Sequence, residues 1–399
     1  MARSSILGLF EVLNSANIVV HQTRCAVVRN KNATCMKCAQ ACTSGCISYD
    51  DNELIISPDL CVGCGTCATV CPTCALEAHH PSDGELYGAC KEAAAAADGK
   101  LVISCEQIAA AARKHLDATR VAQVVCLGRV EESLLVRLAA DGVEQIVLVS
   151  GPCETCEHKV GLKTAKLVCQ TTKTLLETWN NTCNVRLSDK FPSFVRLTER
   201  LAYDASKRAF FDTAGKDAKL VATHAANEKV REVLGETDEE SENAPESRYL
   251  KVMADGTLPH FIPDRRERLL DSLARLGDPN PGYIETRLWG HVSIDVTLCT
   301  SCRMCATFCP TGAIVKFDEE DGTFGIEHRA GDCVKCRCCT DICPKGALVL
   351  EDVVDARAIS EGTVERHVLP PRSKEPSGPH AILNYMRDLF EDTDQIYER

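Results

Sequence analysis

The cysteines of this chain are numerous and regularly spaced, which is typical of residues that bind metal. There are 26 cysteines in 399 residues, and two groups near the C-terminal end have the same spacing, C-x2-C-x2-C-x3-C followed by proline. A tight loop with this spacing can present three thiolates to one cubane [4Fe-4S] cluster, while its fourth cysteine ligates a second cluster. The two loops must then cooperate. We expect two ligand sets: Cys299, Cys302, Cys305 with Cys343, and Cys333, Cys336, Cys339 with Cys309.

A second pair of cysteine loops lies near the N-terminus. One loop is regular, with Cys61, Cys64, Cys67 and Cys71 before a proline. The other is irregular. Its tail, CTSGCI from Cys42, aligns with CPTCAL, CPTGAI and CPKGAL in the other three loops, which places Cys42 at the fourth-ligand position.

The irregular loop leaves its first ligand open. In the favoured register, Cys38 and Cys35 take the third and second positions, and Cys25 is the first ligand across an insertion that contains the polar run RNKN. In the alternative register the ligands of this loop are Cys35, Cys38, Cys42 and Cys46, so that Cys46 is a ligand instead of Cys25. The favoured register predicts two further sets: Cys25, Cys35, Cys38 with Cys71, and Cys61, Cys64, Cys67 with Cys42. Cys46, Cys74 and Cys338 are then bystanders.

A single C-x2-C pair is also compatible with a structural zinc site. Four loops with the same order, three of them followed by proline, favour iron-sulfur clusters instead. These residues resemble the bacterial two-cluster ferredoxins, and the resemblance implies a βαββαβ fold around each pair of loops. The segments beside the C-terminal loops alternate as strands of such a fold would: HVSIDV, AIVKF, FGIEHR and ALVLE.

Between the cysteine loops, the pattern changes to alternating helices and strands. We expect helices over 85–97, 106–116 and 131–142, and strands over 101–104, 121–126 and 143–151. Such alternation predicts a small α/β unit with a parallel sheet. Cys105, Cys126, Cys153 and Cys156 lie at or just past the carboxyl ends of these strands. Because those ends face one crevice, the four thiols can converge on a metal.

The same stretch resembles the small iron-sulfur (delta) subunit of methyl-viologen-reducing hydrogenases, which passes electrons to heterodisulfide reductase. The matching residues are Cys126-Leu127-Gly128-Arg129-Val130, Gly151 with Cys153, Cys156-Glu157-His158 and Lys159-Val160-Gly161. The resemblance implies one [2Fe-2S] cluster held by Cys126, Cys153, Cys156 and Cys105, with Cys90 as the other candidate for the first ligand. Zinc remains the alternative metal here. Arg129 could donate to cluster sulfurs or form a surface ion pair.

The fold class expected is α+β and multidomain, with two ferredoxin-like two-cluster modules flanking a small α/β parallel-sheet domain. The expected units are a ferredoxin module over 1–84, a delta-subunit-like domain over 85–190, a helical and linker region over 191–285, a ferredoxin module over 286–353 and a tail over 354–399. This arrangement would place a fifth centre between the two modules.

The expected linker and the expected tail each contain an amphipathic segment that could pack against another domain or subunit. The amphipathic stretch 264–277 predicts a helix that covers a neighbouring domain. A second amphipathic helix, expected over 380–391, could pack on this chain or dock on a partner subunit.

The net charge of −12 argues against nucleic acid as a partner and favours a basic protein face. We expect no membrane span, because no apolar run is long enough. The first 25 residues lack a signal-peptide core, so we expect a cytoplasmic location, where thiols stay reduced.

No nucleotide-binding glycine loop and no nucleophile with its base are apparent in the sequence. We therefore expect a non-catalytic electron-transfer subunit, with no catalytic residue of its own. Its partner would be a hydrogenase, a formate dehydrogenase or a heterodisulfide-reductase-like protein. The alternatives are a cysteine-based reductase that acts on a disulfide, with Cys153 and Cys156 as a redox pair, and a redox-sensing iron-sulfur regulator.

Overall fold

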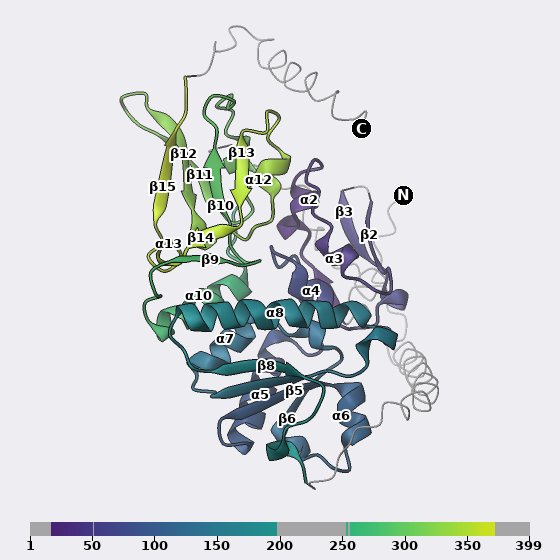
Figure 1. The fold of residues 1–399 in the computed structure, drawn as a ribbon. Coiled ribbons are helices and arrows are strands. Elements are labelled where there is room, and N and C mark those ends of the chain that lie inside the picture. The colour runs from purple at the N-terminus through teal and green to yellow at the C-terminus, as the bar shows by residue number, and fades with distance from the viewer. Residues whose placement is uncertain (1–16, 51, 198–252, 254–255, 372–399) are drawn as a thin grey trace, which may run out of the picture.

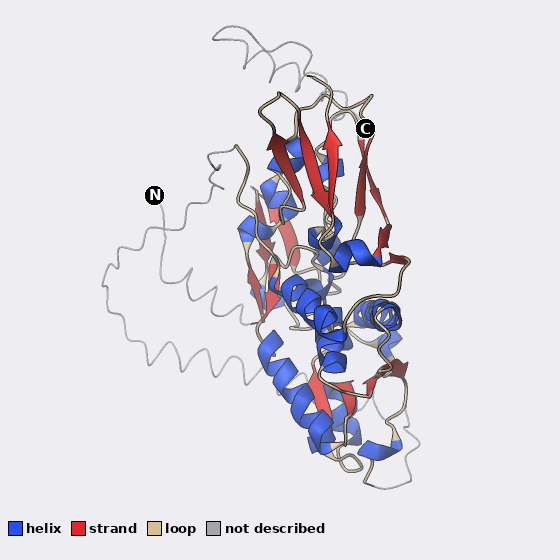
Figure 2. Cartoon of the chain, turned by 90° about the vertical axis from the view of Figure 1, so that its left-hand side faces the viewer, coloured by secondary structure: helices blue, strands red, loops and turns tan. Residues whose placement is uncertain are grey.

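The computed structural model describes residues 17–50, 52–197, 253 and 256–371. Three units lie side by side (Figure 1): the N-terminal and C-terminal cysteine-rich units, and the central α/β unit on one side of both. The view turned by 90° shows an elongated molecule with strands towards both ends and helices between them (Figure 2). The expected tail helix over 380–391 and the acidic linker at 235–247 lie outside the described residues.

The N-terminal and C-terminal units repeat one pattern of strands. Each has an antiparallel outer pair that encloses an antiparallel hairpin. The N-terminal unit pairs β1 (Ile18–Val20) with β4 (Leu76–Ala78), and β2 (Ile47–Asp50) with β3 (Glu53–Ile56). The C-terminal unit pairs β10 (His291–Ile294) with β13 (Leu348–Glu351), and β11 (Ile314–Asp318) with β12 (Phe324–Arg329). The four strands predicted around the C-terminal loops are confirmed.

Short helices follow the cysteine loops in both units. They are α2 (Ala26–Arg29), α3 (Lys37–Gln40), α4 (Thr66–Val70), α11 (Met304–Thr307) and α12 (Cys338–Asp341). Each is only one turn or slightly longer, so packing rather than helix propensity must hold it.

The C-terminal unit continues past the expected boundary at residue 353. Strand β15 (Val364–Val368) pairs with β12 and completes a three-stranded sheet. Strand β14 (Val353–Asp355) pairs with β9 (Tyr283–Glu285), and α13 (Ala356–Ser360) connects β14 to β15. The sequence segment assigned to a separate tail therefore belongs in part to this unit.

The central unit is a four-stranded sheet in the order β6-β5-β7-β8, and each neighbouring pair is parallel. The expected parallel sheet is confirmed. Its strands are β5 (Lys100–Cys105), β6 (Val121–Val124), β7 (Gln145–Val149) and β8 (Asn184–Ser188). Its helices are α5 (Asp83–Ala96), α6 (Glu106–Ala112), α7 (Glu132–Ala140) and α8 (Lys159–Thr178). Buried aliphatic residues such as Leu101, Ile103 and Ile146 form its core.

Helix α10 (Asp264–Leu276) covers a neighbouring unit, as expected from its amphipathic sequence. Leu269 and Leu273 pack with Val136 of α7 and with Trp289 of the C-terminal unit in one buried cluster. The helix therefore joins the central and C-terminal units. None of the helices in the described part of the chain is long and apolar enough to span a membrane.

The order of the units along the chain is not their order in space. The N-terminal unit contacts the C-terminal unit directly: the backbone N–H and the hydroxyl of Thr34 donate to Asp341 at 2.7 and 2.9 Å, and Lys37 donates to the carbonyl of Lys335 at 3.3 Å. The central unit contacts the N-terminal unit on another side, where Thr69 donates to the carbonyl of Arg129 at 3.1 Å. The central unit thus does not separate the two cysteine-rich units.

Asp83, at the start of α5, binds three arginines, one from the central unit and two from α10. Its carboxylate accepts from Arg129 at 2.5 Å, from Arg265 at 3.2 Å and from Arg268. Burial alone would raise the pKa of Asp83, but Arg265 and Arg129 outweigh it and hold the pKa well below its usual range. The carboxylate is therefore ionised in the folded state and ties α10 to the central unit.

We expect Asp83→Asn to lower the free energy of unfolding by about 3 to 5 kcal/mol, because it leaves buried guanidinium groups uncompensated. Since the folded-state pKa of Asp83 is depressed, its contribution should be complete at neutral pH and should be lost as the pH falls below about 4. Anaerobic urea unfolding followed by circular dichroism measures both effects. Asp271→Asn, which removes an exposed pair with Arg275, should change stability by less than about 0.5 kcal/mol. Equal midpoints for the two variants would contradict the prediction.

Candidate metal centres

The three regular cysteine loops share one backbone conformation. Between their first three cysteines, two residues of each loop have a positive φ of 53 to 71°. These are Gly63 and Gly65, Ser301 and Arg303, and Lys335 and Arg337. Four of the six are not glycine, so the left-handed conformation costs free energy that the fold must offset. Such repeated strain is typical of functional loops.

In the C-terminal unit, the thiols gather in the two predicted sets. Burial raises the pKa of Cys305, and the neighbouring charges of Cys302, Cys299 and Cys343 raise it further. Burial likewise raises the pKa of Cys339, with Cys333 and Cys309 as its strongest neighbours. Burial raises the pKa of Cys336, and the neighbouring charges of Cys338, Cys309 and Cys339 raise it further. The structure thus brings together the thiols of each set, including the fourth from the opposite loop.

The irregular N-terminal set also comes together. Burial, then Cys71 and Cys25, raise the pKa of Cys38 to about 12, and burial raises that of Cys25, which has Cys71 and Cys35 as neighbours. Cys25 follows a 3-10 turn and donates its N–H to Gln22 at 3.0 Å. Cys61 and Cys333 make the same bond to the carbonyl three residues earlier, at 3.1 and 3.2 Å. The backbone at Cys25 therefore resembles that of the first cysteines of these two regular loops, and α2 lies within the insertion.

Cys42 has the surroundings of a fourth ligand. Its Sγ lies 3.4 Å from the hydroxyl of Ser44, two residues later. The equivalent contacts are 3.6 Å for Cys71 with Thr73 and 3.9 Å for Cys309 with Thr311. The structure therefore agrees with the alignment of the loop tails.

Cys46 lies beside Cys42 and the first cysteine of the regular N-terminal loop. It is buried, its Sγ is 3.4 Å from that of Cys42, and a hydrogen bond with Cys61 raises its pKa. Cys46 therefore lies with Cys42 beside the Cys61 set, where the last ligand of the irregular loop is expected in either register. The position it occupies is alanine in the other loops, at Ala75, Ala313 and Ala347.

These four sets fit [4Fe-4S] clusters. The cysteines of the described residues are free thiols, and those of each set are crowded where ionisation without a cation would be unfavourable. Backbone N–H groups also point at the sulfurs: Ala75 donates to Cys71 and Ala347 to Cys343, both at 3.3 Å, and Ser301 to Cys299 at 3.4 Å. Such bonds stabilise anionic sulfur ligands and tune the reduction potential.

Three of the four central cysteines, Cys105, Cys126 and Cys153, are neighbours at the carboxyl edge of the parallel sheet. Burial, and then Cys64, Cys105 and Cys153, raise the pKa of Cys126 to about 12. Gly128 donates its N–H to Cys126 at 3.4 Å. Cys156 accepts from the N–H of His158 at 3.5 Å and lies 3.9 Å from Gln107, two residues after Cys105. The donor set is compatible with an iron-sulfur cluster, and it equally suits zinc.

Two other residues considered for this site lie elsewhere. Cys90 is fully buried in the hydrophobic core of the central unit, and burial alone raises its pKa to about 12. Arg129 donates to the carbonyl of Pro81 at 3.1 Å and to Asp83. Of its two proposed roles Arg129 therefore takes the ion pair, but the pair is buried rather than on the surface.

Glycines allow the central site to approach the Cys64 loop closely. A Cβ atom on Gly128 would lie 2.2 Å from the Thr66 hydroxyl, and one on Gly65 would lie 2.5 Å from the Arg129 side chain. A Cβ on Gly161 would lie 2.2 Å from the Sγ of Cys126. Only glycine permits this packing between the two cysteine loops.

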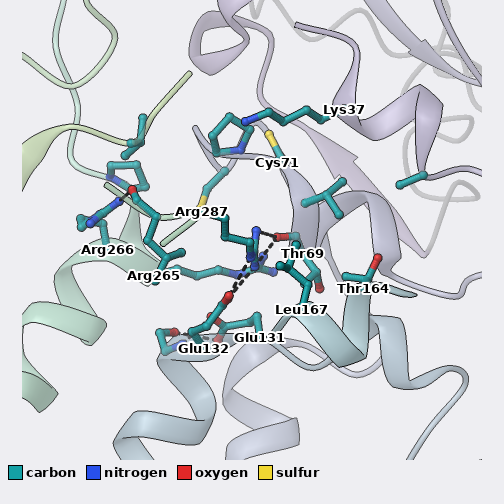
Figure 3. A pocket seen from close by; sticks show the side chains of 18 of the residues that line it. Lys37, Thr69, Cys71, Glu131, Glu132, Thr164, Leu167, Arg265, Arg266 and Arg287 are labelled. Carbon is teal, nitrogen blue, oxygen red and sulfur yellow. Dashed lines mark hydrogen bonds and ion pairs between the residues drawn. The ribbon is translucent and has the colours of Figure 1, made fainter. Parts of the chain in front are cut away.

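A cavity of ≈ 370 Å³ lies where the three units meet, and Cys71 is in its wall (Figure 3). Arg287 crosses it to reach Glu132 and the carbonyl of Thr69, the latter at 3.2 Å. Cys74 also lines the cavity and has a positive φ of 48°, at the position that is glycine in the other three loop tails. Burial raises its pKa to about 11, so the thiol is protonated at neutral pH.

Sequence spacing did not find the arginines that contact the cysteine loops. Arg29 donates to the carbonyls of Pro259 at 2.9 Å and Cys309 at 3.5 Å. Arg265 donates to Ala68 at 2.7 Å, and Arg266 to Cys333 at 3.2 Å. The amphipathic helix was the only signal for the last two, because an arginine bound to a distant carbonyl leaves no local pattern.

Three segments of the chain match known families. Residues 298–347 match a 4Fe-4S dicluster domain, residues 54–77 a 4Fe-4S binding domain, and residues 97–193 the delta subunit of methyl-viologen-reducing hydrogenase. A curated protein named "Ferredoxin 7Fe", from Hydrogenibacillus schlegelii, is 38% identical over 39 residues. That match covers 10% of this chain and 50% of the ferredoxin, so the chain spans about half the length of this relative. No solved structure matches the chain.

The comparisons confirm both resemblances seen in the sequence. The chain has 4Fe-4S binding segments of the ferredoxin type towards both ends and a hydrogenase delta-subunit-like domain between them in sequence. It is an iron-sulfur protein of mixed helices and sheets. The individual ligand assignments stay predictions.

We expect Cys25→Ser to lose one cluster, or about four iron atoms per chain, because it removes a ligand of the irregular set. Cys46→Ser should keep the full iron content, because Cys42 already supplies the fourth thiol of the neighbouring set. Anaerobic iron and sulfide analysis measures both. Cys183→Ser, outside the five thiol sets, is the matched control and should also keep all its iron. Full iron in Cys25→Ser together with a loss in Cys46→Ser would overturn this register.

Proposed function

We propose that this chain is an electron-transfer subunit of a redox complex, with five iron-sulfur centres in one unbranched row. The observation that carries the proposal is that each thiol set neighbours the next, either directly or, between the two modules, across Cys338. The row runs from the central set to the Cys61 set, the Cys25 set, the Cys333 set and finally the Cys299 set. Four of these centres would be [4Fe-4S] clusters, and the central one would be [2Fe-2S].

The first link joins the central set to the Cys61 set. Among the neighbouring charges that raise the pKa of Cys126, that of Cys64 is the strongest. The loops that carry these two cysteines pack through Gly128 and Thr66 without room for a Cβ. A centre at each loop would therefore lie close to the other.

The second link lies inside the N-terminal unit. Burial and then Cys64 and Cys38 raise the pKa of Cys67, so the third cysteines of the two loops are neighbours. The fourth cysteine of each loop also belongs to the other set. The same crossed arrangement supports the last link, between Cys305 and Cys339 of the C-terminal unit.

The third link crosses from the N-terminal to the C-terminal unit. Cys338 is fully buried, and it packs against Ala26, Ala33 and Cys35 from one unit and Cys336 from its own. Burial raises the pKa of Cys338 to about 12, with Cys309 as its strongest neighbour. The two modules thus meet beside a predicted ligand on each side.

The clusters supply the chemistry, since each accepts and releases single electrons. The protein positions their thiolates, buries part of each thiol set and directs N–H groups at the sulfurs. The outer ends of the row are the natural docking points for partners. We propose a hydrogenase, a formate dehydrogenase or a heterodisulfide-reductase-like protein as the partner, in keeping with the delta-subunit-like domain.

A disulfide-reductase function has one observation in its favour, the cavity lined by Cys71 and Cys74. The raised pKa of Cys74 counts against it, because the nucleophile in thiol exchange is the thiolate. Electron transfer therefore remains the better supported function.

We expect about 18 iron atoms per chain after anaerobic purification, from four four-iron clusters and one two-iron cluster. Iron and sulfide analysis with EPR of the reduced protein measures this. A content near 16 iron atoms would show that the central site holds no iron-sulfur cluster. A content near 8 would contradict the row as a whole.

We expect Gly128→Ala to weaken the magnetic coupling between the central centre and its neighbour. The added Cβ must separate the Cys64 and Cys126 loops, whereas the iron content should not change. EPR of the fully reduced protein detects the coupling as a broadening or splitting of the signals. Gly88→Ala in α5, where a Cβ has open space, is the matched control. Identical spectra for the two variants would refute a direct contact between these centres.

A further inference from the structure

Three side chains with nitrogen or oxygen donors meet in the C-terminal unit, away from the cysteine sets. His291 comes from β10, His328 from β12 and Glu365 from β15, and one donor atom of each lies within 4.8 Å of the others. The two imidazole rings are 5.8 Å apart between centroids and nearly perpendicular. The cluster therefore joins three strands from two sheets.

The strand register explains why these groups converge. His328 of β12 lies directly opposite Glu365 of β15. His367 follows two residues later on β15, so it projects from the same face of the sheet. Its Nε2 lies 3.8 Å from Glu365, and the Nδ1 of His291 lies 3.5 Å from the same carboxylate. The Glu365 carboxylate thus lies close to the imidazoles of His291 and His367 and opposite His328 in the strand register.

Two of these imidazoles have a buried nitrogen that makes no hydrogen bond within the described residues. His328 is 1% exposed, and its Nε2 makes no hydrogen bond within the described structure. The buried Nε2 of His367 makes none either. A buried polar atom without a partner is rare in proteins and requires an explanation. A bound cation would supply the missing partner.

We propose that His291, His328 and Glu365 bind a divalent cation of the zinc class, with His367 available as a fourth ligand. Two or three imidazoles and a carboxylate are the donors that Zn²⁺ accepts in proteins. Hard cations such as Mg²⁺ and Ca²⁺ prefer oxygen alone. The site contains no thiolate, so it is distinct from the iron-sulfur centres and does not depend on the proposed electron transfer.

The site would hold β15 against the rest of the C-terminal unit. Just after β15, Leu369 donates its N–H to Phe324 at 3.0 Å and is buried against the Cys299 set. The next residue, Pro370, accepts from Ser301 at 2.6 Å. A cation that fixes β15 therefore fixes the segment that covers the last centre of the row.

Zinc uptake by the full chain tests this site. The protein, purified anaerobically and washed with a chelator, is dialysed against Zn²⁺, and zinc and iron are then measured by mass spectrometry. We expect the wild type to hold one more zinc per chain than His328→Gln or Glu365→Gln, with equal iron in all three. Glu365 is 46% exposed, so its variant tests the site even if His328→Gln fails to fold. The matched control is His21→Gln, which removes an imidazole paired with Glu77 alone, and it should keep the extra zinc.

The ligands of the extra zinc provide the second criterion. X-ray absorption should show nitrogen and oxygen neighbours at about 2.0 to 2.2 Å. Sulfur neighbours at about 2.3 Å would assign the zinc to a cysteine set and would overturn the proposal. Equal zinc in the wild type and both variants would also overturn it.

Discussion

Guanidinium groups that donate to loop carbonyls hold the cysteine loops in place. A loop that wraps a metal centre cannot pair its backbone in a sheet, so its carbonyls need other donors. Arg29, Arg265, Arg266 and Arg287 supply them, each across a boundary between separate segments of the fold. Burial lowers the pKa of Arg266 to about 10, which still leaves it protonated at neutral pH. Asp83 and Glu132 compensate part of the buried charge.

The arginines explain why the units meet where the thiols are densest. Each of these hydrogen bonds is made to a residue within or next to a cysteine loop. The contacts that dock the units therefore also bring the predicted metal centres close together. Charge placed in this way also acts on the centres themselves, since Arg29 lies beside Cys338 and Cys309. A cation near a cluster favours its reduced, more negative state. The junction would therefore influence both the assembly of the units and the reduction potentials of the proposed row.

Much of the candidate site was predictable, because cluster binding imposes a local spacing. The spacing predicted four thiol sets, and the run of buried strands predicted the parallel sheet whose edge gathers Cys105 and Cys126. What the sequence could not supply was the docking of the units. The contact of Gly128 with Thr66, the position of Cys46 beside Cys61 and the pairing of β15 with β12 all depend on shapes formed by distant segments. Periodicity and spacing carry no information on such contacts.

The contact between Thr34 and Asp341 joins residues 307 positions apart. At a synthesis rate of roughly 5 to 20 residues per second, the ribosome needs roughly 15 to 60 s to make the intervening chain. During that time, the N-terminal cysteine loops have no C-terminal unit to cover Cys35. The newly made half must therefore be shielded from oxidants, or must acquire its iron early, before its permanent cover exists.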